Sequence, residues 1–235
     1  MKEILTSQLF SREERGSRHL TTLCLIRGYG DFHSLERYLH INEQKRYNKF
    51  PALIRKNSYI LGRYCAKRAL SQIYPEISAS EIEIDRGVFY YPIIRHPKVQ
   101  NTQVSITHTE CAAAAIVFKD DHPVGIDIEI VNSGKSKTIQ KQLSERENTL
   151  QGDMEKAEFN TILWTSKESL SKALKIGMMA SPMLYEIEDI TRLSIHAYET
   201  TFKYFFQYKA VSYKFDDLIL TLCYPKKSQI ESPLV

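Results

Sequence analysis

Two carboxylates placed two residues apart are the first candidates for chemistry in this sequence. Asp127 and Glu129 lie in the stretch 122–130, whose intervening positions carry Val or Ile, a pattern typical of a β-strand. On a strand the two side chains share one face, with Cα atoms about 6.6–6.8 Å apart. Such close like charges repel unless a cation lies between them, and oxygen ligands suit Mg²⁺. An outer strand with a solvated acidic face would explain the same pattern.

A second group of candidates follows on a helix predicted over residues 159–175. Trp164, Glu168 and Lys172 stand at positions i, i+4 and i+8, so they share one face of that helix. A Glu–Lys pair at this spacing is also ordinary on helix surfaces. Glu147 stands three residues after Ser144, the spacing of a capping box, which leaves a structural and a functional role both open.

Basic residues are concentrated between residues 41 and 70. This segment carries eight of them against the single acid Glu43, a larger surplus than the +4 of the whole chain. The pattern predicts helices over 42–50 and 57–73, interrupted at Pro51. A solvated basic face and a seat for a multiply charged anion both explain the run. Its members are Lys45, Arg46, Lys49, Arg55, Lys56, Arg63, Lys67 and Arg68.

Short strands and turns must position these helices and the acidic strand. Residues 111–118 and 123–130 are predicted to pair as a hairpin that presents Asp127 and Glu129, with turn residues between them. Residues 131–138 are polar and are predicted to form a loop. Further strands are predicted at 20–26, 82–84, 104–106, 184–190, 201–208 and 218–224.

Composition limits the class of protein. The 235 residues are 43% hydrophobic and 26% charged, which allows one large or two small globular domains. The net charge of +4 is too small to indicate nucleic-acid binding. The four cysteines are far apart and form no CxxC pair, so neither a zinc site nor a disulfide framework is indicated. No apolar run has the length of a signal peptide or a membrane span, and we expect a soluble, cytoplasmic protein.

Three stretches together resemble the Sfp-type 4′-phosphopantetheinyl transferases. They are Ser105-Ile-Thr-His-Thr109, Gly125-Ile-Asp-Ile-Glu129 and Trp164-Thr-Ser-Lys-Glu-Ser-Leu-Ser-Lys172. They are similar to the family's (S/N)-I-S-H-S, G-I-D-x-E and W-x-x-K-E-(S/A)-x-x-K blocks, in the same order and at similar separations. Leu61-Gly62-Arg63 with Lys67 resembles the family's G-R-x-x-x-(R/K) helix, and Asn42-Glu43 with Arg46 its basic first helix. The likeness covers about residues 42–174.

The resemblance implies an α+β fold, a pseudo-dimer of two similar subdomains that each contain a small antiparallel sheet with packed helices. We expect an N-terminal subdomain at 1–118 with the basic coenzyme A-binding helices, and a C-terminal subdomain at 119–235 with the metal and catalytic residues. The implied activity is that of a holo-[acyl-carrier-protein] synthase. It is the Mg²⁺-dependent transfer of the 4′-phosphopantetheine arm of coenzyme A to a serine of an apo acyl- or peptidyl-carrier protein, with release of adenosine 3′,5′-bisphosphate. A monomer is expected, with no membrane or nucleic-acid partner, acting in fatty-acid, polyketide or nonribosomal peptide biosynthesis.

The same resemblance implies roles for individual residues. Asp127, Glu129 and Glu168 would hold Mg²⁺. Lys172 would stabilise charge on the pyrophosphate, and either Glu168 or Glu147 would take the proton from the carrier serine. The basic helices and His108 would hold the 3′-phosphate. The full set of implied coenzyme A contacts is Lys45, Arg46, Lys49, Arg63, Lys67, Thr107, His108 and Lys172, and which of Lys45, Arg46 and Lys49 are ligands stays open.

Two departures and two alternatives accompany this interpretation. The family often has Gly-Lys-Pro ahead of its S-H-S block, where this chain has Tyr90-Tyr91-Pro92, so that Arg86 and Arg95 become candidates to replace the lysine. Thr107 replaces a serine and keeps the hydroxyl. A non-catalytic coenzyme A- or carrier-binding relative is disfavoured by the three carboxylates. A nucleic-acid-binding module is disfavoured because the basic segment has no Gly-rich or aromatic-interleaved signature.

Overall fold

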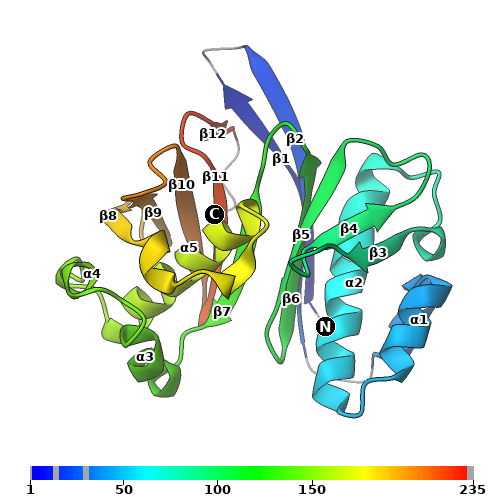
Figure 1. Ribbon diagram of the computed structural model, residues 1–235, viewed down its shortest axis with the longest axis horizontal. Coiled ribbons are helices and arrows are strands. Elements are labelled where there is room, and N and C mark those ends of the chain that lie inside the picture. Colours follow the sequence, from blue (N-terminus) through cyan, green and yellow to red (C-terminus); the bar gives the residue numbers. More distant parts are fainter. Residues whose placement is uncertain (1, 13–15, 29–31, 232–235) are drawn as a thin grey trace. The chain divides into compact units, whose positions relative to one another are not determined.

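The computed structural model describes residues 2–12, 16–28 and 32–231, which form two compact units (Figure 1). The first contains the described residues up to His122 together with Ile230 and Glu231, and the second runs from Pro123 to Gln229. Each unit is an antiparallel sheet with packed helices, so the predicted α+β fold with two similar subdomains is confirmed. Within the described ranges, no helix combines the length and the apolar character needed to cross a membrane.

The first unit is built on a sheet with the strand order β12-β1-β2-β6-β5. Strands β1 and β2 pair along their whole length, with Lys2 opposite Arg27. A separate hairpin of β3 and β4 lies beside β5. The bounds are β1 (Lys2–Arg12), β2 (Ser17–Arg27), β3 (Glu83–Arg86), β4 (Pro92–Arg95), β5 (Thr102–His108), β6 (Ala112–Lys119) and β12 (Gln229–Ile230).

The two helices predicted in the basic segment are present as α1 (Ile41–Asn48) and α2 (Leu53–Ile73), with Pro51 between them. Helix α2 packs on β2, β5 and β6 and buries an apolar face that includes Ile60 and Cys65. The alanine-rich run is strand β6, as predicted, because its small side chains lie in the core beneath α2. Two short 3-10 helices, η2 (His33–Tyr38) and η3 (Ala79–Glu81), complete the unit.

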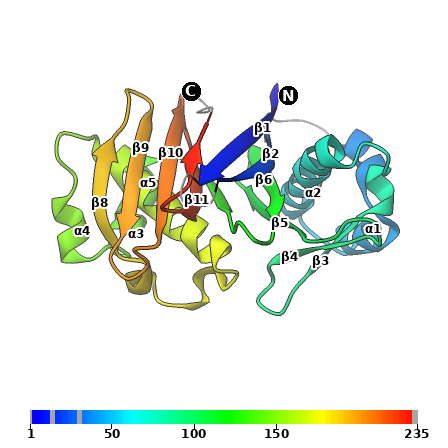
Figure 2. The same cartoon turned by 90° about the horizontal axis from the view of Figure 1, so that it is seen from above.

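The second unit has the strand order β7-β11-β10-β9-β8. Helix α5 covers β7, β10 and β11, and its apolar side chains form the core with those of the sheet (Figure 2). The strands are β7 (Gly125–Ile130), β8 (Ile187–Arg192), β9 (Ala197–Phe202), β10 (Tyr208–Phe215) and β11 (Leu218–Pro225). The helices are α3 (Ser133–Gln140), α4 (Glu145–Thr149), α5 (Lys156–Ala173), η4 (Gly177–Met179) and η5 (Pro182–Tyr185).

The two units share one chain path. The first follows β2–α1–α2–β3–β4–β5–β6, and the second follows β7–α4–α5–β8–β9–β10–β11. The spatial order also agrees, because β2-β6-β5 followed by the hairpin β4-β3 corresponds to β7-β11-β10-β9-β8. The equivalence makes α2 and α5 counterparts, and likewise α1 and α4.

Three sequence predictions about local structure are wrong. The stretches at 111–118 and 123–130 are both strands, but they form no hairpin, because β6 pairs with β2 and β5 whereas β7 pairs with β11. The predicted loop at 131–138 contains helix α3, which the Asn132 side chain caps by accepting from two backbone N–H groups. The strand predicted at 201–208 contains instead the turn between β9 and β10.

Candidate active site

Gly125 determines how closely strand β7 and helix α5 approach. A Cβ atom at this position would lie 1.9 Å from the carbonyl oxygen of Ser169 and 2.6 Å from the backbone nitrogen of Ala173. Only glycine therefore allows the helix backbone to lie directly on the strand. The close approach brings Asp127, two residues further along the same face of β7, against the exposed stripe of α5.

That stripe consists of the residues predicted to share a face. Trp164, Glu168 and Lys172 are partly exposed, while nearly every other residue of α5 between Ala157 and Ala173 is buried. The Lys172 ammonium donates to a carboxylate oxygen of Asp127 over 2.6 Å. Asp127 itself is 4% exposed. The predicted helix and strand thus bring one carboxylate and one lysine into direct contact.

The other two carboxylates, Glu129 and Glu168, interact electrostatically with Asp127. Burial raises the pKa of Glu168 to about 7, and the negative charges of Asp127 and Glu129 act in the same direction while Lys172 opposes them. Burial also raises the pKa of Glu129, again with a contribution from Asp127, although Lys135 lies 3.3 Å away. The three carboxylates therefore repel one another despite the neighbouring lysines.

These residues fit a hard divalent cation by their donor chemistry. Carboxylate oxygens are the ligands that Mg²⁺ prefers, and a bound cation would remove the repulsion that raises the pKa values of Glu129 and Glu168. In the described parts of the chain no three acidic, His or Cys side chains enclose an ion as they stand, and the Lys172 ammonium is the cation that contacts Asp127.

Glu147 lies apart from this cluster in a buried network of its own. Its carboxylate accepts from the backbone N–H of Ser144 (2.7 Å), the backbone N–H of Ile187 (2.8 Å) and the ammonium of Lys167 (2.8 Å). The Ser144–Glu147 capping box is thus confirmed, and Glu147 is 0% exposed. Its contacts tie α4, α5 and β8 together.

The first unit contains the same network at equivalent positions. Glu43 accepts from the backbone N–H of His40 (2.8 Å), the backbone N–H of Ile84 (3.0 Å) and the ammonium of Lys67. Lys67 is completely buried and also donates to the Tyr38 carbonyl. The structure thus places Lys67 in a buried ion pair rather than at the surface.

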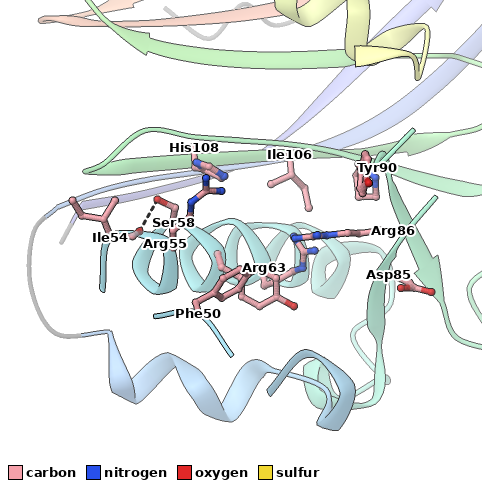
Figure 3. A pocket seen from close by; sticks show the side chains of 12 residues that line it. Phe50, Ile54, Arg55, Ser58, Arg63, Asp85, Arg86, Tyr90, Ile106 and His108 are labelled. Atoms are coloured by element: carbon pink, nitrogen blue, oxygen red, sulfur yellow. Dashed lines mark hydrogen bonds between the residues drawn. The ribbon is translucent and has the colours of Figure 1, made fainter. Parts of the chain in front are cut away.

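Two of the other predicted basic contacts line a cavity in the first unit. The cavity measures about 490 Å³ and lies between α2, β5 and the β3–β4 hairpin (Figure 3). Figure 3 shows Arg63 and Arg86 pointing toward each other, with Arg55 and His108 at the other end. Burial lowers the pKa of Arg63. Tyr59 and Glu43 oppose this shift, while the charge of Arg86 acts in the same direction as burial. The residues that line the cavity are Phe50, Ile54, Arg55, Ser58, Tyr59, Arg63, Asp85, Arg86, Tyr90, Pro92, Ile106 and His108.

The remaining predicted contacts lie elsewhere. Arg46 forms ion pairs with Glu83 (2.8 Å) and Asp85 (2.7 Å), and Lys45 and Lys49 are exposed on or just after α1 without lining the cavity. Thr107 alternates with the lining residues on β5 and is buried.

Of the two candidates to replace the missing lysine, Arg86 lines the cavity, whereas Arg95 is paired with Asp85 at 2.7 Å. Sequence reasoning missed Tyr59 and Tyr90 as lining residues. In the sequence, the one signal at Tyr90 is its place in the motif that departs from the Gly-Lys-Pro of the family.

Two comparisons with known proteins bear on this arrangement. Residues 123–223, which contain β7 and α5, match the family model described as the 4′-phosphopantetheinyl transferase superfamily. The chain is also similar to the holo-[acyl-carrier-protein] synthases of Lactococcus lactis subsp. cremoris (strain SK11) and Lactococcus lactis subsp. lactis (strain IL1403). Each is 29% identical over 89 residues, which cover 35% of this chain and 75% of the relative. Together they support phosphopantetheinyl transfer as the general activity.

Proposed function

We propose that the protein is a 4′-phosphopantetheinyl transferase of the Sfp type, which moves the phosphopantetheine arm of coenzyme A to a serine of an apo acyl- or peptidyl-carrier protein. Adenosine 3′,5′-bisphosphate is the leaving group. The observation that carries the proposal is the cluster of Asp127, Glu168 and Lys172 where α5 lies on β7, within the segment matched by the family model. Transfer of a phosphoryl group requires positioning and charge stabilisation, which such a cluster provides.

In this proposal the carboxylate cluster acts on the pyrophosphate of coenzyme A. Asp127, Glu129 and Glu168 would hold Mg²⁺, which when bound supplies positive charge to the pyrophosphate oxygens. Lys172 adds a fixed positive charge, because its ammonium is held by Asp127 at 2.6 Å. The carrier serine oxygen attacks the phosphorus atom, and the bond between phosphorus and the leaving bisphosphate breaks.

We assign the general base to Glu168. It is partly exposed and shares the α5 stripe with Lys172, so that it can take the serine proton directly or through one water. Glu147 already accepts from three donors and is fully buried. Its counterpart Glu43 has the same three kinds of donor in a unit that lacks the carboxylate cluster, which favours a structural role for both.

The cavity of the first unit would take the nucleotide portion of coenzyme A. Arg55 and Arg86 line the cavity and have no ion-pair partner within the described ranges. Arg63 also lines the cavity and forms an ion pair with Glu43 at 3.6 Å. Guanidinium groups that point toward one another, as those of Arg63 and Arg86 do, suit a phosphate group. We further propose a monomer that works in the cytoplasm, since one chain carries both subdomains and its four cysteines are buried and reduced.

The decisive experiment is incubation of the protein with coenzyme A, Mg²⁺ and a panel of apo acyl- and peptidyl-carrier proteins. Intact-mass measurement should show that a carrier gains the phosphopantetheine group. A carrier whose acceptor serine is replaced by alanine, and the Asp127→Asn variant of this protein, are the matched controls and should show no gain.

Two other results would point to the alternatives. Binding of coenzyme A without a mass gain on any carrier would indicate a non-catalytic relative. Retention on a DNA or heparin column at moderate salt, together with no retention on immobilised coenzyme A, would indicate a nucleic-acid-binding module.

A further inference from the structure

Tyr90 occupies a backbone position that suits glycine. It is the third residue of the loop 88–90, which Gly87 and Tyr91 close between β3 and β4. Gly87 N–H donates to the Tyr91 carbonyl (2.8 Å), and Tyr90 N–H donates to the Gly87 carbonyl (3.0 Å). The third residue of such a connection adopts the left-handed conformation, and Tyr90 has φ of 61°. A bulky side chain is disfavoured there, and an outlier of this kind points to a function.

Packing does not account for the tyrosine. Tyr90 is 75% exposed and the adjacent Val88 is 84% exposed, so neither contributes much to the core. The neighbouring Tyr91 does have a packing role, because a Cβ atom at Gly87 would fall 2.6 Å from its ring. The Tyr90 ring is therefore held at an unfavourable backbone position without a gain in buried area.

The ring does line the cationic cavity. Figure 3 shows Tyr90 near Arg86, at the end away from His108. The other two aromatic lining residues are already engaged, since Arg63 lies 4.5 Å from the centre of the Tyr59 ring and Phe50 packs against Tyr59. Among the lining residues, Tyr90 is thus the aromatic whose face is open to a ligand.

We propose that Tyr90 is the stacking platform for the purine base of the nucleotide bound in this cavity, and hence a specificity-determining residue. Guanidinium groups at Arg63 and Arg86 recognise phosphate but give no preference for a base. An exposed ring beside them adds a flat apolar surface of the kind on which bases stack. This inference rests on the proposed function, because it takes the nucleotide to be that of coenzyme A.

The test compares the parent protein with Tyr90→Gly by titration calorimetry with adenosine 3′,5′-bisphosphate. Loss of one base–aromatic stack should weaken binding about 5- to 150-fold. The same variant should melt at a higher temperature, because glycine relieves the left-handed backbone. Inorganic pyrophosphate, which has charge but no base, should bind to the parent and to Tyr90→Gly with equal affinity.

Three further variants separate the ring from the backbone. Tyr90→Phe keeps the ring and should bind the nucleotide like the parent, whereas Tyr90→Asn tolerates the left-handed region and should reproduce the loss. Asp216 has φ of 56° in the turn between β10 and β11, so Asp216→Gly should raise the melting temperature without changing nucleotide affinity.

Equal nucleotide affinity of the parent and Tyr90→Gly would overturn the inference and leave the proposed function standing. If the parent bound neither coenzyme A nor the bisphosphate, the proposed function itself would fail. A higher melting temperature together with weaker nucleotide binding in Tyr90→Gly would support the inference.

Discussion

At the scale of single residues, Glu168 distinguishes a surface ion pair from a catalytic site. An exposed i,i+4 pair contributes only a few tenths of a kcal/mol, and glutamine is an equally good helix former. If Glu168 ligates the metal or takes the proton, Glu168→Gln should lower turnover about 10²- to 10⁴-fold. The melting temperature should stay the same or rise, because a partly buried carboxylate that Asp127 and Glu129 repel is removed.

The measurement is turnover at saturating apo carrier together with a thermal melt. Glu155→Gln is the matched control, since Glu155 stands at the N-terminus of the same helix, outside the carboxylate cluster. If Glu168→Gln melts like the parent and has nearly the same turnover, Glu168 has no catalytic role.

His122 predicts a loss of stability in mild acid. It is 1% exposed and its ring stacks on that of His19, with centroids 4.5 Å apart. Burial lowers its pKa to about 4, helped by the charges of His19 and Arg12 and opposed by Asp121. The unfolded chain, with a pKa of about 6.5, therefore binds the proton first. Stability should fall as the pH drops from about 6.5 to 4, by at most about 3 kcal/mol from this group.

Urea denaturation at several pH values tests this expectation. His122→Gln should flatten the acid side of the stability profile, while His33→Gln, which changes an exposed histidine paired with Glu36, should not. Identical pH profiles for parent and His122→Gln would show that other groups cause the acid sensitivity.

At the scale of elements, the two buried Glu–Lys networks predict paired effects. Glu43→Gln and Glu147→Gln each leave a completely buried lysine without its counter-charge, Lys67 in the first unit and Lys167 in the second. Removing one partner of a buried ion pair typically costs about 3–5 kcal/mol of folding stability. Both variants should therefore unfold at clearly lower urea concentration than the parent.

Turnover per folded molecule then tests the role of Glu147. If both glutamates only hold the fold, the two variants should keep similar activity at a temperature where each remains folded. A loss of activity specific to Glu147→Gln, on the order of 10²-fold or more, would return Glu147 to the position of general base.

Local periodicity explains which elements the sequence could predict. The helix α5 and the strand β7 follow from apolar spacing within a single stretch, and the Ser144–Glu147 box is a local signal. The predicted hairpin of β6 and β7 was wrong because strand pairing depends on residues distant in the sequence, here those of β11. The burial of Lys67 was also hidden, since its partner Glu43 lies 24 residues earlier on another helix.

At the scale of the whole molecule, the basic surplus is much smaller than the sequence indicates. Lys67 is neutralised by Glu43, Arg46 by Glu83 and Asp85, and Arg68 by Glu3. Of the basic residues without an ion-pair partner in the described ranges, Arg55 and Arg86 line the cavity beside Arg63, whereas Lys45 and Lys49 are exposed outside it. A count of charges along the chain locates the basic segment. Only the structure separates the basic residues that line the cavity from those that form ion pairs within the fold.

This distinction leads to a prediction about two arginines of one hairpin. Arg86 lines the cavity, whereas Arg95 is paired with Asp85 at 2.7 Å and does not. Arg86→Ala should raise the Michaelis constant for coenzyme A by about 10-fold or more, as expected for one charge-assisted contact of about 1.5–3 kcal/mol. Arg95→Ala should leave it nearly unchanged. If Arg86 contacts the 3′-phosphate, dephospho-coenzyme A should show a much smaller effect of the same substitution. Equal Michaelis constants for the two variants would place the nucleotide outside this cavity.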